Sequence, residues 1–303
     1  MHVRYGIDLG GTKIELLALG AGNAELLRKR EATPAGSYSG TIDAISALVR
    51  HADEMLAPGQ PATIGVGIPG TISPASGLVK NANSTCLIGK PLQIDLEAAL
   101  GRPVRLANDA NCFALSEATD GAAAGYDSVF GVILGTGVGG GLVHHGHLIS
   151  GINGIAGEWG HNPLPWPDLN CGESPGPRCY CGLNGCIETF LSGPALARDA
   201  GLDVDAAQIS KDAQAGNTDA EAALDRYTQR LAKALASVIN IYDPDAIILG
   251  GGLSNIERLY MDVPARWGKY VFSDSVLTKL LPPRHGDSSG VRGAAWLWPG
   301  DET

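Results

Sequence analysis

The feature that most constrains this chain of 303 residues is a pattern that occurs twice: an apolar run, a glycine-rich turn and a second apolar run. The first copy covers residues 5–19 (YGIDLGGTKIELLAL), and the second covers residues 128–150 (SVFGVILGTGVGGGLVHHGHLIS). Each copy predicts two adjacent strands joined by a tight turn. Two segments that open in the same way predict two similar halves, each a sheet with helices.

The rest of the chain supplies the other elements of such an α/β fold. Residues 62–70 and 103–107 predict further strands, and AIILGGG at residues 246–252 repeats the strand-and-glycine pattern a third time. Helices are expected at residues 41–57 and on a long stretch whose apolar residues recur every three or four positions. That stretch carries Leu224, Tyr227, Leu231, Leu235 and Val238.

These elements divide into two expected lobes. The first comprises residues 1–120 and the second comprises residues 121–287, with the boundary in the small and polar segment at 118–126. A C-terminal helix at about 288–303, begun by Ser288 or Ser289, is expected to pack back on the first lobe.

Charge and hydropathy exclude several classes of protein. The formal net charge is −10 and no basic patch stands out, which argues against a nucleic-acid partner. The N-terminal segment lacks the parts of a signal peptide, and no apolar run approaches the ~18–20 residues that span a membrane. We therefore expect a cytoplasmic protein, in a compartment where disulfides are rare.

The glycine turns favour phosphate binding. Residues 135–140 (GTGVGG) match the G-x-G-x-x-G spacing, but the segment after them is strand-like, whereas a dinucleotide fingerprint must open a helix. No Walker A sequence occurs. Two facing β-turns could instead hold the β- and γ-phosphates of a nucleotide through backbone N–H groups. The alternative is two ordinary hairpins; the pairing of the turns, with Asp8 before one of them, favours phosphates.

Asn108 and Asp109 stand at the end of an apolar strand, where α/β sheets gather their ligand sites. Asp109 could accept a proton from a substrate hydroxyl as a general base. From spacing alone, a helix N-cap is the more favoured interpretation of this pair.

Three cysteines within eight residues, Cys179, Cys181 and Cys186, form the pattern C-x-C-x4-C. A disulfide between the first two would be strained, and the spacing differs from that of the redox motif C-x-x-C. The three thiolates predict a structural Zn²⁺ site that needs a fourth ligand.

His161 is the favoured fourth ligand, since it ends the glycine-framed segment GEWGH. Cys171 is the alternative, although nothing near it resembles a second metal-binding turn, and the histidines at 144, 145 and 147 also compete. Cys86 and Cys112 are expected to be buried as small apolar residues.

Together these segments resemble the ROK family of sugar kinases and sugar-responsive repressors, within the actin/hexokinase-like superfamily. The matching stretches run in order along the chain: GIDLGGTK (6–13), GVGIPG (65–70), ANDANC (107–112), ILGTGVGGG (133–141), GEWGHNPL (157–164), CYCGLNGCIE (179–188) and AIILGGG (246–252). KNANST at 80–85 and the ending HGDSSGVRGAAWLW at 285–298 look most like the bacterial fructokinase, or mannose/fructose kinase, branch.

The resemblance implies a two-lobed, ribonuclease H-like fold with a duplicated core, a sugar and ATP cleft between the lobes, and a homodimer. It implies that Asp109 is the catalytic base on the 6-hydroxyl of the sugar. Residues implied to bind the other sugar hydroxyls are Asn108, Glu158, His161 and Glu188. Residues implied to surround ATP and Mg²⁺ are Asp8, Gly10, Gly11, Thr12, Thr136, Gly137, Gly251 and Gly252. The implied zinc ligands are His161, Cys179, Cys181 and Cys186.

The activity implied is that of a fructokinase, with ATP, Mg²⁺ and a structural Zn²⁺ as cofactors. Mannose, glucose and N-acetylhexosamines are the alternative acceptors. A non-catalytic sugar sensor is a second class, disfavoured by the intact Asp109, by both glycine turns and by the expected lack of room for a DNA-binding domain before the first strand. A nicotinamide oxidoreductase with structural zinc is a third.

Overall fold

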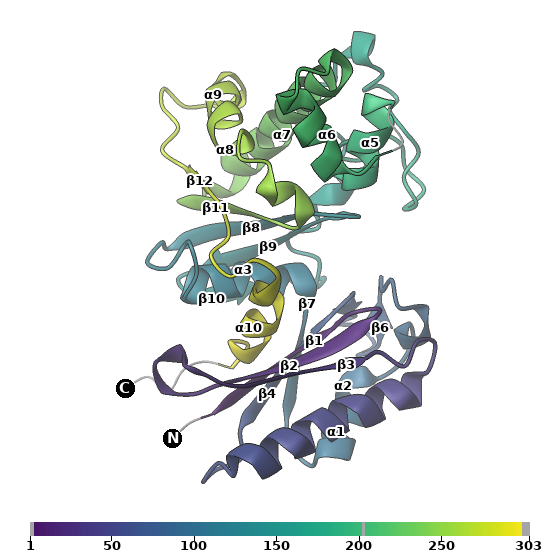
Figure 1. Cartoon of the computed structure of the whole chain (residues 1–303), viewed down its shortest axis with the longest axis vertical. Coiled ribbons are helices and arrows are strands. Elements are labelled where there is room, and N and C mark those ends of the chain that lie inside the picture. The colour runs from purple at the N-terminus through teal and green to yellow at the C-terminus, as the bar shows by residue number, and fades with distance from the viewer. Residues whose placement is uncertain (1–2, 202–203, 299–303) are drawn as a thin grey trace.

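The computed structural model describes residues 3–201 and 204–298, which form two five-stranded sheets with their helices (Figure 1). The strands are β1 (Arg4–Leu9), β2 (Lys13–Leu19), β3 (Glu25–Ala32), β4 (Thr63–Ile68), β5 (Thr71–Ile72), β6 (Val79–Lys80), β7 (Val104–Asn108), β8 (Ser128–Leu134), β9 (Val138–His144), β10 (His147–Ile149), β11 (Ala246–Gly250) and β12 (Lys279–Leu281). The helices are α1 (Tyr38–Leu56), α2 (Leu92–Leu100), α3 (Asp109–Thr119), α4 (Glu188–Leu191), α5 (Gly193–Ala200), α6 (Ala206–Gln214), α7 (Thr218–Tyr242), α8 (Leu259–Asp262), α9 (Pro264–Trp267) and α10 (Ser289–Ala295).

The two sheets have the same construction. The first has the strand order β3-β2-β1-β4-β7 and the second has the order β10-β9-β8-β11-β12. In each sheet the first three strands are antiparallel neighbours and the last two run parallel to the central strand. The predicted duplication of the strand–turn–strand pattern is therefore confirmed.

Two helices lie between the sheets in the middle of the molecule (Figure 1). α10 packs on β1, β2 and β4 of the first sheet and against α3, while α3 packs on β8 and β9 of the second. α1 and α2 cover the outer face of the first sheet, and the long α7 belongs to the core on the outer face of the second. The boundary at residue 120 stays a prediction. It assigns α3 to the first lobe, while α3 packs mainly on β8 and β9 of the second sheet and to a smaller extent on β4 and β7 of the first.

Glycines let α10 approach its neighbours at backbone distance. A Cβ on Gly6 would collide with the carbonyl oxygen of Val291, and one on Gly65 would collide with that of Ala294. A Cβ on Gly293 would meet the carbonyl oxygen of Cys112 in α3. No side chain larger than hydrogen fits at these three positions, so the middle layer is tightly packed.

The starts of α1 and α10 can be compared with the expected residues. α1 begins three residues before the expected 41, because the Ser37 hydroxyl accepts a hydrogen bond from the Gly40 N–H. The helix expected to begin at Ser288 or Ser289 does begin there: α10 starts at Ser289 with Ser288 in the N-cap position. Ser288 makes no side-chain capping bond, and Ser289 Oγ donates to the buried carboxylate of Glu117 at 2.7 Å. Residues 299–303 of the expected C-terminal helix lie outside the described residues.

A buried ion cluster anchors the loop that precedes the cysteines to α7. Glu173 accepts hydrogen bonds from Arg230 and Lys233, each at 2.8 Å, and from the Asp168 N–H at 2.7 Å. Burial disfavours its charged form, but these donors outweigh burial and hold the pKa of Glu173 below its ordinary value.

We expect Glu173→Gln to lower the free energy of unfolding by about 3–5 kcal/mol, because it leaves buried cations without their carboxylate. Urea unfolding at neutral pH measures this change. Glu221→Gln is the matched control, since Glu221 pairs with Arg258 at an exposed site, where ion pairs contribute about 0–1 kcal/mol. Equal effects of the two substitutions would contradict the buried cluster as an anchor.

No helix within residues 3–201 and 204–298 is long and apolar enough to cross a membrane.

Candidate active site

A cavity of about 890 Å³ gathers all of the residues predicted to bind the sugar. Its walls come from the ends of β4 and β7, the turn between β8 and β9, and the loops around residues 158–161 and 180–188. Among the predicted residues, it is lined by Asn108, Asp109, Thr136, Gly137, Glu158, His161, Cys181 and Glu188.

Asp109 lies at the floor of this cavity, as the first residue of α3. The N-cap interpretation of the Asn-Asp pair is confirmed for Asn108, whose Oδ1 accepts from the Ala110 N–H at 2.8 Å. The role of Asp109 as a general base stays a prediction. Asp109 Oδ1 accepts from the same N–H at 2.7 Å. Although the residue is exposed toward the cavity, the protein around its carboxyl raises its pKa, and the bond from Ala110 only partly offsets this.

Asp8, on β1, pairs with Glu15 of β2 on one side and with Gly67 of β4 on the other. Burial raises the pKa of Asp8 to about 6, and the charges of Asp109 and Glu15 add to the effect, while Lys13 opposes it. Carboxylates that raise each other's pKa, as Asp109 does for Asp8, are typical of a site that accepts a cation or a proton.

This pKa has a consequence for stability. Between about pH 4 and pH 6 the folded chain binds more protons at Asp8 than the unfolded chain, so the free energy of unfolding falls as the pH rises through this interval. We expect Asp8→Asn, which cannot ionise, to be more stable than the wild type by up to about 3 kcal/mol at pH 7.5 and by about half of that at pH 5. Urea unfolding at the two pH values tests this, and a difference that does not change with pH would contradict it.

Glu188 is held against the second glycine turn. Its Oε2 accepts from the Val138 N–H at 2.9 Å, and a Cβ on Gly137 would lie 2.7 Å from that oxygen. Gly137 is therefore needed for the approach of the carboxylate. Burial raises the pKa of Glu158 on the opposite loop, and the charges of Asp109 and Glu188 add to it.

A second cavity, of about 730 Å³, adjoins the first through Gly135 and Thr136, which line both. It is bounded on the other side by Gly252 and by the start of α5. A Cβ on Gly135 or Gly252 would meet no protein atom within 4 Å, so the backbone there is open to a ligand. This arrangement fits a nucleotide whose phosphates reach the glycine turn from the second cavity.

The remaining residues predicted to bind ATP do not line the two large adjoining cavities. Gly11 lines a smaller cavity of about 260 Å³ beside the first turn, whereas Asp8, Gly10, Thr12 and Gly251 line none of the cavities described here. Gly251 has φ +77, and a Cβ there would collide with the carbonyl oxygen of Leu134. The positive φ and this close approach therefore explain why residue 251 is a glycine.

The lobes are also joined at the mouth of the site. Thr71 Oγ1 donates to the Gly154 carbonyl oxygen and Lys80 Nζ donates to that of Asn153, both at 3.1 Å. These bonds tie the small β5–β6 hairpin to the loop that leads to Glu158.

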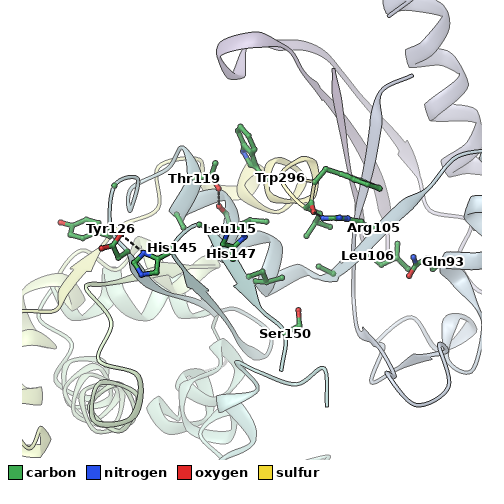
Figure 2. A pocket seen from close by; sticks show the side chains of 18 residues that line it. Gln93, Arg105, Leu106, Leu115, Thr119, Tyr126, His145, His147, Ser150 and Trp296 are labelled. Atoms are coloured by element: carbon green, nitrogen blue, oxygen red, sulfur yellow. Dashed lines mark hydrogen bonds and ion pairs between the residues drawn. The ribbon is translucent and has the colours of Figure 1, made fainter. Parts of the chain in front are cut away.

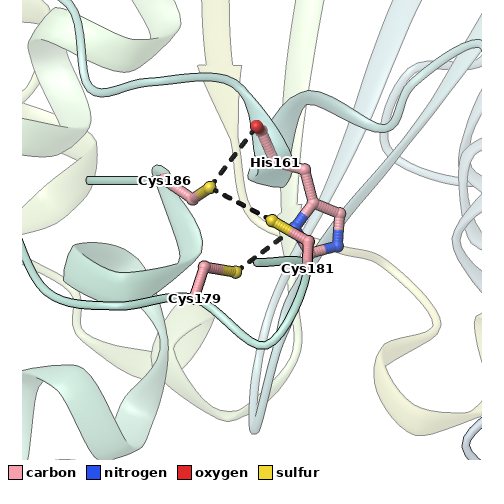
Figure 3. A group of neighbouring side chains, drawn as sticks. All are labelled: His161, Cys179, Cys181 and Cys186. Carbon is pink, nitrogen blue, oxygen red and sulfur yellow. Dashed lines mark hydrogen bonds between the residues drawn. The ribbon is translucent and has the colours of Figure 1, made fainter. Parts of the chain in front are cut away.

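His161, Cys179, Cys181 and Cys186 form one cluster, with all four candidate ligand atoms within 4.8 Å of one another (Figure 3). His161 Nδ1 lies 3.6 Å from Cys179 Sγ, and Cys181 Sγ lies 3.6 Å from Cys186 Sγ. Ligands around a tetrahedral Zn²⁺ at its usual bond lengths are about 3.6–3.8 Å apart, so the donor set and its spacing fit zinc.

The other cysteines lie apart from this cluster. Cys171 is exposed and its Sγ donates to Asp168 at 3.4 Å, which leaves His161 as the fourth member of the group. Cys112 is buried as expected. The expectation for Cys86 is wrong in degree, since this residue is only partly buried and lines the smaller cavity beside Gly11.

Several lining residues were not predicted. Asn81 and Asn83 belong to the KNANST segment, which was noticed only for its resemblance, and the φ of +56 at Asn81 shows how tightly that segment turns. Tyr180 is one of the unspecified residues of the C-x-C-x4-C pattern, so it was not predicted as a site residue. A sequence pattern does not show which way a loop side chain points.

A further cavity, of about 800 Å³, contains none of the predicted site residues (Figure 2). It is lined by Arg105 of β7, by the β9–β10 hairpin and by the residues that follow α10. The guanidinium of Arg105 is already engaged there, by the carbonyl oxygen of Leu297 at 2.7 Å and by the ring of Trp298.

Residues 4–301 match the sequence profile of the ROK family. The chain belongs to the ROK family. It is 42% identical over 300 residues to an N-acetyl-D-glucosamine kinase of Photobacterium profundum, covering 97% of this chain and 98% of the relative. An N-acetyl-D-glucosamine kinase of Yersinia enterocolitica is 41% identical over the same shares of the two chains.

Solved ROK structures share the fold. The crystal structure of a ROK hexokinase from Thermus thermophilus has a TM-score of 0.85 and 32% identity, over 97% of each chain. A ROK glucokinase from Streptomyces griseus, in complex with glucose and AMPPNP, has a TM-score of 0.76 and 29% identity, over 97% of this chain and 98% of that one. The predicted two-lobed sugar-kinase fold is thus confirmed for this ROK chain.

Proposed function

We propose that this ROK protein is an ATP-dependent sugar kinase that phosphorylates the 6-hydroxyl of N-acetyl-D-glucosamine. The observation that carries the proposal is the adjacency of the two cavities, one lined by Asp109, Glu158 and Glu188, the other opening on the same glycine turn. A sugar in the first and a nucleotide in the second would meet at Gly135 and Thr136.

The choice of sugar rests on the relatives. The N-acetyl-D-glucosamine kinases at 41–42% identity favour the alternative that the sequence left open, an N-acetylhexosamine kinase, over fructokinase. Glucose is the second candidate, because the Streptomyces griseus relative is a glucokinase.

In the proposed reaction, Asp109 orients the 6-hydroxyl and accepts its proton as the oxygen bonds to the γ-phosphorus and the bond to ADP breaks. Because its pKa is raised, this carboxylate is a stronger base than an ordinary aspartate. Asn108, Glu158 and Glu188 would hold the other hydroxyls, and Asp8 would lie at the phosphate end. Mg²⁺ would neutralise charge on the β- and γ-phosphates.

His161 and the three cysteines would hold a structural Zn²⁺, with all four positions filled by protein. His161 and Cys181 also line the sugar cavity, so the metal would fix the loops that bind sugar. The bonds made by Thr71 and Lys80 would keep the lobes closed and exclude water, which otherwise competes as the phosphoryl acceptor. The homodimer and the cytoplasmic location stay predictions.

An ADP-release assay with ATP and Mg²⁺ tests the proposal on zinc-replete protein. The panel contains N-acetylglucosamine, N-acetylmannosamine, glucose, mannose and fructose at matched concentrations. We expect the highest kcat/KM with N-acetylglucosamine. A preference for fructose would restore the expectation from the sequence, and the lack of sugar-dependent ADP release with every hexose would contradict the kinase.

A further inference from the structure

The hydroxyl of Tyr180 lies beside His161, a residue that the resemblance implies to bind a sugar hydroxyl. It lines the large cavity together with His161, Glu158 and Glu188. Its Oη lies 2.9 Å from His161 Nε2, and the two rings meet edge to face with their centroids 5.1 Å apart. The imidazole nitrogen that was expected to meet the sugar is therefore already paired with a tyrosine.

The direction of this hydrogen bond follows from the other side of the imidazole. Nδ1 of His161 faces the thiols, at 3.6 Å from Cys179 Sγ (Figure 3). A neutral imidazole that offers one nitrogen to a metal carries its proton on the other. Nε2 then donates, and Tyr180 Oη accepts.

The hydrogen of the tyrosine hydroxyl is left available. A phenol both accepts and donates, and within the described residues Tyr180 Oη has no hydrogen-bond partner besides His161. The side chain is 81% exposed, so nothing else packs over it in the cavity. A polar hydrogen at this place, facing a cavity lined by carboxylates, suits an oxygen of a polyol.

We propose that Tyr180 is a sugar-contacting residue of this site, which accepts a hydrogen bond from His161 and donates its own to an oxygen of the bound hexose. The inference rests on the proposed function and deepens it. The cysteines on either side of the tyrosine would then link the metal cluster to sugar recognition.

Tyr180→Phe tests the proposal, because it keeps the ring and its edge-to-face packing and removes only the hydroxyl. Calorimetry without ATP measures the Kd for the sugar, and steady-state kinetics separates KM from kcat. We expect Kd and KM for N-acetylglucosamine to rise about tenfold, with kcat within about twofold of the wild type. Zinc content, measured by mass spectrometry, should not change.

Tyr126→Phe is the matched control. Tyr126 is also partly exposed, at 38%, and lines the separate cavity of Figure 2. This control should leave Kd, KM and kcat unchanged.

Singly deoxygenated hexoses identify the contacted oxygen. The wild type should bind one deoxy analogue with a Kd about tenfold higher than that of the intact hexose. Tyr180→Phe should bind this analogue and the intact hexose with similar Kd values. An unchanged Kd in Tyr180→Phe would overturn the proposal. A tighter Kd would overturn it too, since it would mean that the sugar displaces the tyrosine to reach His161.

Failure of the proposed function has a different signature. It is read from the wild type alone, as absence of binding and turnover with N-acetylglucosamine. If another hexose of the panel binds, the comparison of Tyr180→Phe with the wild type is made with that hexose, and the same outcomes decide it. If no hexose binds the wild type, both proposals are overturned.

Discussion

Asp109→Asn is expected to lower kcat for sugar phosphorylation by about a thousandfold, within the 10²–10⁴ range of general-base catalysis. The substitution keeps the shape of the side chain and an oxygen that can accept from the Ala110 N–H, the bond that now holds it at 2.7 Å. It removes only the ability to take up the proton. The Kd for the sugar should therefore change much less than kcat.

Single-turnover kinetics and calorimetry on the same protein measure the two effects. Asp43→Asn is the matched control, since Asp43 is an exposed residue of α1, on the outer face of the first sheet. A variant of Asp109 that retains a tenth or more of the wild-type kcat would mean that the hydroxyl loses its proton elsewhere.

Cys181→Ser is expected to release zinc and to raise the KM for the sugar by tenfold or more. Metal affinity depends on the complete ligand set, and Cys181 is one of four ligand atoms that lie within 4.8 Å of one another. Its loss should loosen the loop between Cys179 and Glu188, which carries two lining residues of the cavity. Because Cys181 is exposed, the substitution leaves no void in the core.

Zinc content by mass spectrometry, the melting temperature and KM are measured together. Cys171→Ser is the control, since this thiol is exposed as well but bonds to Asp168, outside the cluster. It should keep one zinc per chain and an unchanged KM. Zinc-depleted Cys181→Ser with a wild-type KM would show that the metal stabilises the loop without shaping the sugar site.

The fold was predictable from the sequence where local chemistry decides it. The turn at Gly10 and Gly11 separates β1 from β2 at the expected residues, and the second turn does the same for β8 and β9. The placement of α3 was not predictable, because the apolar residues of a helix indicate that it is buried and not which sheet covers it. Phe113 and Leu115 pack with Val129 and Ile248 of the second sheet.

The candidate site was predictable in its charged and sulfur-bearing members. The spacing of the cysteines indicates a metal site, and the position of Asp109 at the end of a strand indicates a ligand site, so these residues were found from the sequence itself. Glu188 was named only through the resemblance to the ROK family. Tyr180 was not found, because a tyrosine in a loop satisfies its hydroxyl in water, and only the fold brings it to His161. The acceptor sugar depends on such placements, whereas the expectation of fructose rested on the resemblance of two segments, residues 80–85 and 285–298, to the fructokinase branch.

The middle layer also determines when this chain can finish folding. A chain made from its N-terminus exposes the inner face of the first sheet, with Gly6 and Gly65, long before the residues that cover it exist. α10, which covers those glycines, follows every strand of the second sheet in the chain. The first lobe is therefore expected to reach its final packing only after the strands of the second sheet have been made.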